Sequence, residues 1–188
     1  MIKIGILGDI GSGKSYVAGK FGYPVFNADY EVAKLYQQNK KIFNQLKKSL
    51  PKYIFSFPIE KKEISNSILA NEKNLNKIVK IVHKEIRARM NIFLKKHKNK
   101  KIVILDIPLL LENKINKKED ILVFIQSKQS DILKKLKKRK NFNQKLLKKF
   151  KNIQFSQKYK KSKSHYVIKN NFTKKSVKNE IYKILKKL

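Results

Sequence analysis

The chain has 188 residues, of which 41% are hydrophobic, enough for one packed domain with a small subdomain or lid. It contains no cysteine, which excludes disulfides, cysteine metal sites and thiol nucleophiles and suits a reducing compartment. No apolar stretch is long enough to span a bilayer. We therefore expect a cytoplasmic protein without a membrane partner, either a monomer or a weak homo-oligomer.

The formal net charge of +34 comes almost entirely from lysine, since three of the 47 basic residues are arginine. Proteins that read nucleic-acid sequence or clamp phosphates tend to use arginine, whereas here lysine is spread along nearly every segment. The surface is therefore either a set of solvated lysine faces or an evolved polyanion-binding surface. We favour the first and expect no specific nucleic-acid partner, although such a charge draws anionic substrates in either case.

The first predicted element is a strand at 2–7, followed by a loop and a helix that begins near Tyr16. The loop reads Gly8, Asp9, Ile10, Gly11, Ser12, Gly13, Lys14 and Ser15. A glycine, four residues and then Gly-Lys-Ser, set between a strand and a helix, is the phosphate-binding loop (P-loop) pattern. Its backbone N–H groups cradle phosphate, Lys14 supplies an ammonium, and Ser15 offers a hydroxyl to Mg²⁺. An ordinary glycine turn before a helix does not require this full spacing, so we predict a nucleoside triphosphate site.

Apolar spacing predicts the elements that follow. They are a short strand at 23–26, a helix over 29–50 interrupted near Asn39, a short helix at 60–71 and a long helix through 75–93. The segment between Pro51 and Pro58 is predicted to be irregular.

Two later apolar runs, 102–105 and 121–125, are predicted as strands buried on both faces, which is typical of parallel sheets. The remaining predicted elements are helices over 128–139 and to about 154, a last strand at 166–168 and a final helix through 177–188. Strands that alternate with helices predict an α/β protein with a mostly parallel sheet.

Two acids stand where predicted strands end, and function gathers at the carboxyl ends of parallel strands. Asp106 follows the buried strand at 102–105, where an acid can hold Mg²⁺, although a strand-terminal Asp can also be a turn residue. Asp29 follows the second strand and can act as a general base toward an attacking hydroxyl. It can equally well cap a helix that begins at Tyr30, and position alone does not separate these two interpretations.

Two pairs of residues share a helix face because their members are four apart. Lys135 and Arg139 can form a lid clamp on a transferring phosphoryl group, and the scarcity of arginine gives Arg139 the greater weight. His83 and Arg87 lie on the long helix; a lone helical histidine is more often structural than a ligand.

Taken together, these residues resemble the dephospho-CoA kinase family of P-loop kinases. The stretches that carry the resemblance are 4–15, Asn-Ala-Asp at 27–29, Val-His-Lys-Glu-Ile at 82–86, Asp-Ile-Pro-Leu-Leu-Leu-Glu at 106–112 and Val-Ile-Lys-Asn-Asn at 167–171. The resemblance implies a three-layer α/β fold with a five-stranded, mostly parallel sheet, a helical acceptor-binding subdomain and a lid. It implies one domain over 1–188, with its core at about 1–28, 100–127 and 164–188, an acceptor-binding region at about 29–99 and a lid at about 137–152.

The activity implied by the resemblance is transfer of the ATP γ-phosphate to the ribose 3′-hydroxyl of dephospho-CoA, with ATP and Mg²⁺ required. The resemblance also assigns roles. The catalytic residues are Asp29 as base, Lys14 and Arg139; the acceptor-binding residues are His83, Arg87, Asp106 and Leu109; Ser15 and Asp106 bind the metal. The nucleotide-binding residues are Gly8, Asp9, Ile10, Gly11, Ser12, Gly13, Lys14, Ser15, Tyr16 and Asn170.

The chain departs from the family pattern at several positions, including Asn27, Lys84, Asp9 and Lys135, where the family usually has Asp, Pro, Gly and Arg. Lysine cannot reproduce a bidentate arginine contact, and Asp9 adds a negative charge to the loop, although its side chain can point outward. Two other functions are compatible with the P-loop: a kinase of another small nucleotide or metabolite, or an RNA- or ribosome-associated NTPase.

Overall fold

The protein is described by a computed structural model that covers residues 1–140 and 142–188. The chain forms two compact units. Unit 1 comprises Met1–Asn27, His97–Phe142 and Ile153–Leu188, and unit 2 comprises Ala28–Lys96 and Asn143–Asn152. Within the described residues, no helix has the length and apolar character needed to cross a membrane.

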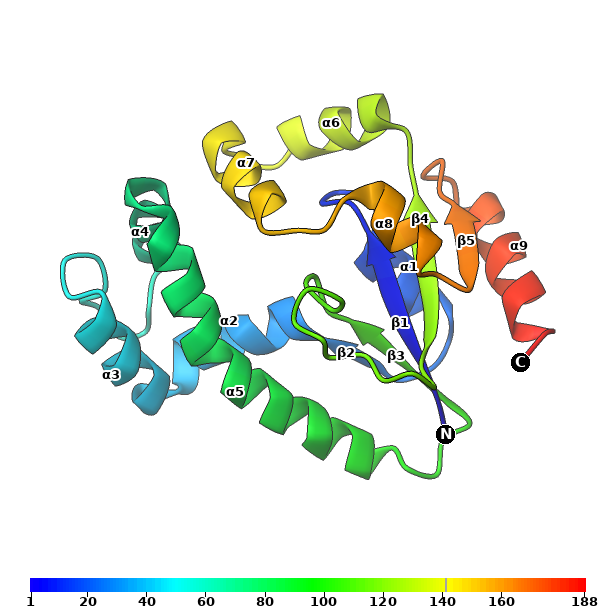
Figure 1. The fold of residues 1–188 in the computed structure, drawn as a ribbon, viewed down its shortest axis with the longest axis horizontal. Coiled ribbons are helices and arrows are strands. Elements are labelled where there is room, and N and C mark those ends of the chain that lie inside the picture. The colour runs from blue at the N-terminus through cyan, green and yellow to red at the C-terminus, as the bar shows by residue number, and fades with distance from the viewer. Residues whose placement is uncertain (141) are drawn as a thin grey trace. The chain divides into compact units, whose positions relative to one another are not determined.

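Unit 1 contains a five-stranded sheet in the order β2-β3-β1-β4-β5 (Figure 1). The strands are β1 (Ile2–Gly8), β2 (Val25–Asn27), β3 (Ile102–Asp106), β4 (Ile121–Gln126) and β5 (Tyr166–Lys169). The four strand pairings among the described residues are all parallel, which confirms the predicted α/β class. The register pairs Asn27 with Asp106 and Gly8 with Ile125, so the loop after β1 and Asp106 share the carboxyl edge.

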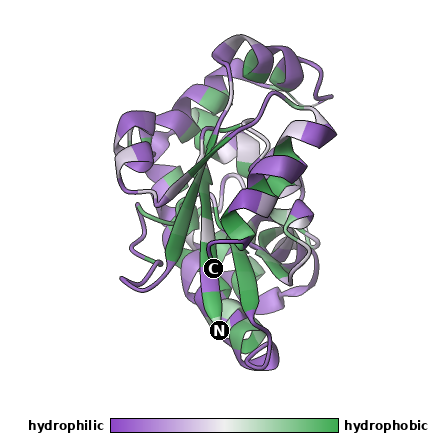
Figure 2. Cartoon of the chain, turned by 90° about the vertical axis from the view of Figure 1, so that its right-hand side faces the viewer, coloured by the Kyte–Doolittle hydropathy of each residue, from purple (hydrophilic) through white to green (hydrophobic). Residues whose placement is uncertain are grey.

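Side-chain alternation along the strands divides the sheet into two buried faces. On one face, Ile4 and Ile6 join a core with α1 (Lys14–Lys20) and α9 (Lys174–Leu185). On the other, a Cβ added at Gly5 would lie 2.5 Å from Leu110 Cδ2, so the turn after β3 packs closely against β1. The strands are accordingly largely green, hence hydrophobic, in Figure 2. Burial on both faces explains the uninterrupted apolar runs at 102–105 in β3 and 121–125 in β4.

Unit 2 is helical. It contains α2 (Ala28–Gln38), α3 (Lys40–Ser49), α4 (Lys61–Ala70), α5 (Glu72–Lys96) and α7 (Gln144–Asn152). α5 is its long central element and contacts α2, α3 and α4. Its buried residues, such as Leu75, Val82 and Ile86, recur at helical spacing. An ion pair of 2.8 Å between Arg89 Nη1 and Glu31 Oε2 joins α5 to α2.

The structure corrects several predicted boundaries. The second strand begins at Val25, not Tyr23, and the helix that follows begins at Ala28. The helix over 128–139 is shorter, α6 (Gln129–Lys137). The helix predicted to run to about residue 154 ends at Asn152, and a separate short helix, α8 (Gln157–Ser162), follows. The signal for α8 is Ser156, whose hydroxyl caps it by accepting from the Tyr159 N–H at 3.2 Å.

Candidate functional site

The P-loop joins β1 to α1 with Gly13 as the N-cap residue of the helix, at φ 89°. Side chains are disfavoured in this left-handed region, so glycine suits the sharp entry into α1. The Lys14 ammonium turns back over the loop and donates to the carbonyls of Gly8 (3.2 Å) and Asp9 (2.9 Å). The ammonium is thereby held at the N-terminus of α1. The helix dipole favours an anion at this end, so the ammonium and the helix end can bind the same phosphate.

Two side chains that directly follow β4 and β5 support the loop at the Ser12 carbonyl. Asn170 Nδ2 donates to this oxygen at 2.9 Å, and Ser127 Oγ donates to it at 3.0 Å. Asn170 is 2% exposed, and its Oδ1 also accepts from the Phe172 N–H at 2.8 Å. Asn170 therefore lies at the P-loop, as its predicted nucleotide-binding role requires, and it stabilises the loop's backbone.

Asp106 is the buried acid of this edge, with 4% of its surface exposed. Burial raises the pKa of its carboxyl group, while hydrogen bonds from Ser15 and Asn27 and the charge of Lys14 oppose that rise. Asn27 Nδ2 donates to Asp106 Oδ2 at 2.7 Å. A buried carboxylate beside the P-loop serine is an arrangement that a bound cation stabilises.

The donor set fits Mg²⁺. Ser15 and Asp106 provide hard oxygen atoms in contact with each other. In the part of the chain that the structure describes, no three His, Cys, Asp or Glu side chains gather into a metal cage. Mg²⁺ in kinases is commonly held by one or two protein oxygens together with substrate phosphates.

Asp9 does not point outward. It is 6% exposed, its Oδ1 accepts from the Ile10 N–H at 2.7 Å, and its Oδ2 accepts from Gln129 Nε2 at 2.9 Å. The extra negative charge of this loop is therefore turned toward the first residue of α6 and is stabilised by two hydrogen bonds.

α6 lies against the P-loop. A Cβ added at Gly11 would come within 2.9 Å of Leu136 Cγ and 3.1 Å of Ile132 Cγ2. Lys135 and Arg139, the predicted clamp, are both exposed. The Lys135 ammonium lies 4.3 Å from the centre of the Phe172 ring. α6 carries Lys135 but ends at Lys137, so the prediction that Lys135 and Arg139 share a helix face is wrong; Arg139 follows the C-cap residue Lys138.

The turn after β3 contains Leu109 and Glu112. Leu109 is half-buried, and its carbonyl accepts from the Asn113 N–H at 3.0 Å. The sequence places Glu112 as a second acid near Asp106. In the structure its Oε1 instead accepts from Lys160 Nζ and from the Phe155 N–H, both at 2.9 Å. Lys160 is 1% exposed, so this is a buried ion pair.

The remaining predicted site residues belong to unit 2. Asp29 is exposed and is the second residue of α2. The helix begins at Ala28, so the interpretation of Asp29 as the cap of a helix starting at Tyr30 is wrong. A carboxylate in a first turn still interacts favourably with the helix dipole.

His83 and Arg87 lie one turn apart on α5. The imidazole is half-buried, and burial, with a smaller contribution from the Arg87 charge, lowers its pKa. His83 Nε2 is buried and has no hydrogen-bond partner among the described residues. Such an atom is costly unless a ligand or water completes its bonding.

The sequence does not predict a role for Ser127, Gln129 or Phe172. Ser127 directly follows β4 and Gln129 begins α6 two residues later, and this position after a strand at the P-loop edge of the sheet is their only signal. Phe172 has φ 65°, a backbone conformation that the sequence does not reveal.

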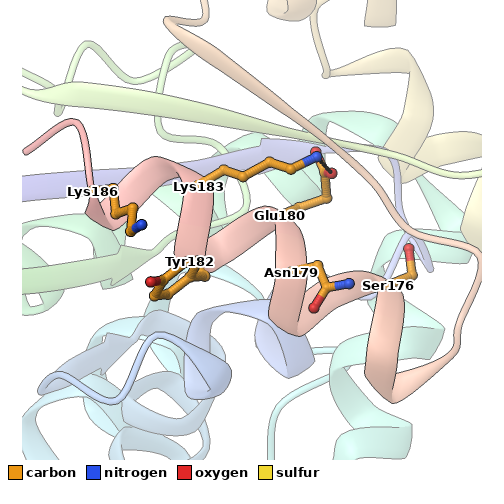
Figure 3. A pocket seen from close by; sticks show the side chains of 6 residues that line it. All are labelled: Ser176, Asn179, Glu180, Tyr182, Lys183 and Lys186. Carbon is orange, nitrogen blue, oxygen red and sulfur yellow. Dashed lines mark hydrogen bonds and ion pairs between the residues drawn. The ribbon is translucent and has the colours of Figure 1, made fainter.

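A pocket of about 540 Å³ is lined by Ser176, Asn179, Glu180, Tyr182, Lys183 and Lys186, all on α9 or at its end (Figure 3). It includes none of the predicted site residues. An ion pair of 3.1 Å between Lys183 and Glu180 spans part of this exposed polar face. We therefore assign the pocket no part in the site.

Comparison with known proteins gives a consistent result. Residues 2–176 match the family model described as dephospho-CoA kinase. A dephospho-CoA kinase of Wolbachia sp. subsp. Brugia malayi is 31% identical over 190 residues, which cover 98% of this chain and 97% of that protein.

Two solved structures share the fold. The TT1252 protein from Thermus thermophilus has a TM-score of 0.77 at 23% identity, covering 100% of this chain and 97% of that one. A dephospho-CoA kinase from Campylobacter jejuni has a TM-score of 0.61 at 18% identity, covering 98% and 96% of the two chains. At these identities the structures support the architecture alone.

Proposed function

Because this chain belongs to the dephospho-CoA kinase family, we propose that its P-loop edge carries out transfer of the ATP γ-phosphoryl group to the ribose 3′-hydroxyl of dephospho-CoA. The observation that carries the proposal is one sheet edge on which the loop, Lys14, Ser15 and the buried Asp106 converge. This activity is the last step of coenzyme A synthesis. The family match covers nearly the whole chain, which disfavours an RNA-associated NTPase or a kinase of another metabolite.

We propose that the loop binds the triphosphate through its backbone N–H groups and that Lys14 then exchanges its carbonyl partners for phosphate oxygens. Ser15 and Asp106 would hold Mg²⁺, which when bound neutralises phosphate charge. Arg139 on the lid side adds a guanidinium that offsets charge developing on the transferred group. Asn170 supports the loop and would lie near the adenine.

We propose that Asp29 accepts the proton of the 3′-hydroxyl as the new P–O bond forms. Its carboxylate is exposed and lies in the first turn of α2. His83, Arg87 and Leu109 would contact the acceptor, and the buried Nε2 of His83 offers it a hydrogen-bonding group. The segment around residues 137–152 would close as a lid and exclude water.

The test is ADP release measured with ATP and Mg²⁺ across a panel of acceptors. We expect turnover with dephospho-CoA and little with nucleoside monophosphates or shikimate, and the product should carry its new phosphate on the 3′-oxygen. Turnover with nucleoside monophosphates and none with dephospho-CoA would contradict the proposal.

A further inference from the structure

Three contacts within unit 1 join the P-loop to α6 and to the segment just before it. Gln129 Nε2 donates to Asp9 Oδ2 at 2.9 Å, Ser127 Oγ donates to the Ser12 carbonyl at 3.0 Å, and Gly11 lies directly under Leu136. The contact between Gly11 and Leu136 is non-directional packing. The hydrogen bond of Ser127 involves a residue that precedes the helix. The Asp9–Gln129 hydrogen bond is a directional contact between the loop and α6 itself.

Both oxygens of the Asp9 carboxylate accept hydrogen bonds, one from Gln129 and one from the backbone of its own loop. It is 6% exposed, and its second oxygen accepts from the Ile10 N–H at 2.7 Å, which fixes the side chain to its own loop. Gln129 is the first residue of α6, and the N-cap residue Lys128 gives this helix no side-chain cap. A negative charge held at this end of the helix interacts favourably with the helix dipole as well as with the Gln129 amide.

α6 ends just before Arg139, whose N–H donates to the Leu136 carbonyl at 3.0 Å. Leu136, which with Ile132 packs on Gly11, thus also bonds to the Arg139 backbone, so a shift of α6 across the loop would move Arg139 with it. We infer that Asp9 is a positioning residue: through Gln129 it holds α6 on the P-loop so that the Arg139 guanidinium is placed for the transferred phosphoryl group. This inference rests on the role proposed above for Arg139.

The test reverses the donor and the acceptor of the Asp9–Gln129 hydrogen bond. Gln129→Glu sets a carboxylate against Asp9, and we expect kcat to fall about tenfold while KM for ATP changes less than twofold, because Arg139 acts in the transition state. Adding Asp9→Asn restores a donor–acceptor pair in the opposite direction, since the new amide nitrogen can donate to the new carboxylate while its oxygen keeps the Ile10 N–H. The double variant should recover kcat to within about threefold of wild type.

Arg139→Ala provides the separating control. Alone it should lower kcat, and Gln129→Glu added to it should lower kcat less than about twofold further, because the two changes act through the same guanidinium. If Arg139→Ala keeps wild-type turnover, the proposed role of Arg139 fails and the positioning role fails with it.

If Arg139→Ala is impaired but Gln129→Glu is not, or if Asp9→Asn does not rescue Gln129→Glu, the positioning role alone is overturned. Thermal unfolding of each variant accompanies the kinetics. A kcat that follows only the folded fraction would also overturn the inference, because a merely structural contact predicts that result.

Discussion

At the residue scale, Gly13 shows how the P-loop depends on a missing side chain. Its φ is 89°, and an added Cβ would lie 2.5 Å from Asn170 Nδ2, the group that supports the Ser12 carbonyl. Gly22 has a similar φ of 76° but nothing within 4 Å of an added Cβ. Substituting each glycine by alanine therefore separates two losses of stability. One is the cost of the left-handed backbone, and the other is the cost of displacing Asn170.

We expect Gly22→Ala to lower the free energy of unfolding by about 1–2 kcal/mol, the cost of a left-handed alanine. Gly13→Ala should cost about 1 kcal/mol more, because the Asn170 hydrogen bond is lost, and it alone should raise KM for ATP. Urea unfolding and ATP kinetics measure both effects. Equal stability losses and an unchanged KM for Gly13→Ala would show that Asn170 does not support the loop.

His83 gives a pH dependence of stability. Burial and Arg87 lower its pKa in the folded protein, so below the ordinary imidazole pKa of about 6.5 the unfolded chain binds the proton more readily. Stability contributed by the neutral imidazole is therefore complete above about pH 6.5 and is lost as the pH falls toward the folded-state pKa.

We expect the difference in unfolding free energy between wild type and His83→Gln to be constant from about pH 8 to 6.5. Below that pH the wild type should steadily lose stability relative to His83→Gln, because glutamine binds no proton. Denaturant unfolding at a series of pH values measures it. A difference that stays constant down to pH 5 would mean that His83 titrates as a solvated imidazole.

At the element scale, α8 is fastened to the turn after β3 by the buried pair of Lys160 and Glu112. Gln154 Oε1 also accepts from Lys160 Nζ at 2.8 Å, so the ammonium is well satisfied. Removing one partner of a buried ion pair leaves the other charge without compensation.

Lys160→Ala should lower the free energy of unfolding by about 3–5 kcal/mol. Lys183→Ala, which removes an exposed ion pair with Glu180, should change it by less than about 0.5 kcal/mol. Chemical denaturation of the two variants makes the comparison. Similar values for both would show that the Lys160 pair is effectively solvated.

These elements also show what the sequence can and cannot predict. Uninterrupted apolar strands and the spacing of Gly8, Lys14 and Ser15 predicted the parallel sheet and the phosphate site, because both depend on local pattern. The supports contributed by Ser127, Gln129 and Lys160 were not predictable. Each depends on a side chain that only the packed fold brings to its partner, and in a chain with this many lysines no pattern marks Lys160.

At the scale of the whole molecule, the net charge of +34 acts on the rate at which anionic substrates arrive. We expect kcat/KM for ATP to fall on the order of tenfold between about 50 and 300 mM salt, because counterions screen the attraction, while kcat changes little. Steady-state kinetics across this range measures both constants. A kcat/KM that does not respond to salt would indicate that the lysine surface is locally neutralised at the site.

In the proposed mechanism, the P-loop edge binds the phosphates and Asp29 accepts the proton. Asp29→Asn keeps the size of the side chain and removes its basicity. Glu72→Gln is a matched control, because Glu72 is also an acid in a first helical turn, that of α5. Loss of the dipole interaction alone costs each helix about 0.3–1 kcal/mol of stability.

Single-turnover transfer from ATP to dephospho-CoA, with ATP binding measured separately, tests the central claim most directly. We predict that Asp29→Asn slows transfer by a factor of about a hundred or more, leaves the Kd for ATP unchanged and contrasts with a near-normal Glu72→Gln. Transfer by Asp29→Asn at close to the wild-type rate would contradict the account and leave Asp29 as a residue that only stabilises α2.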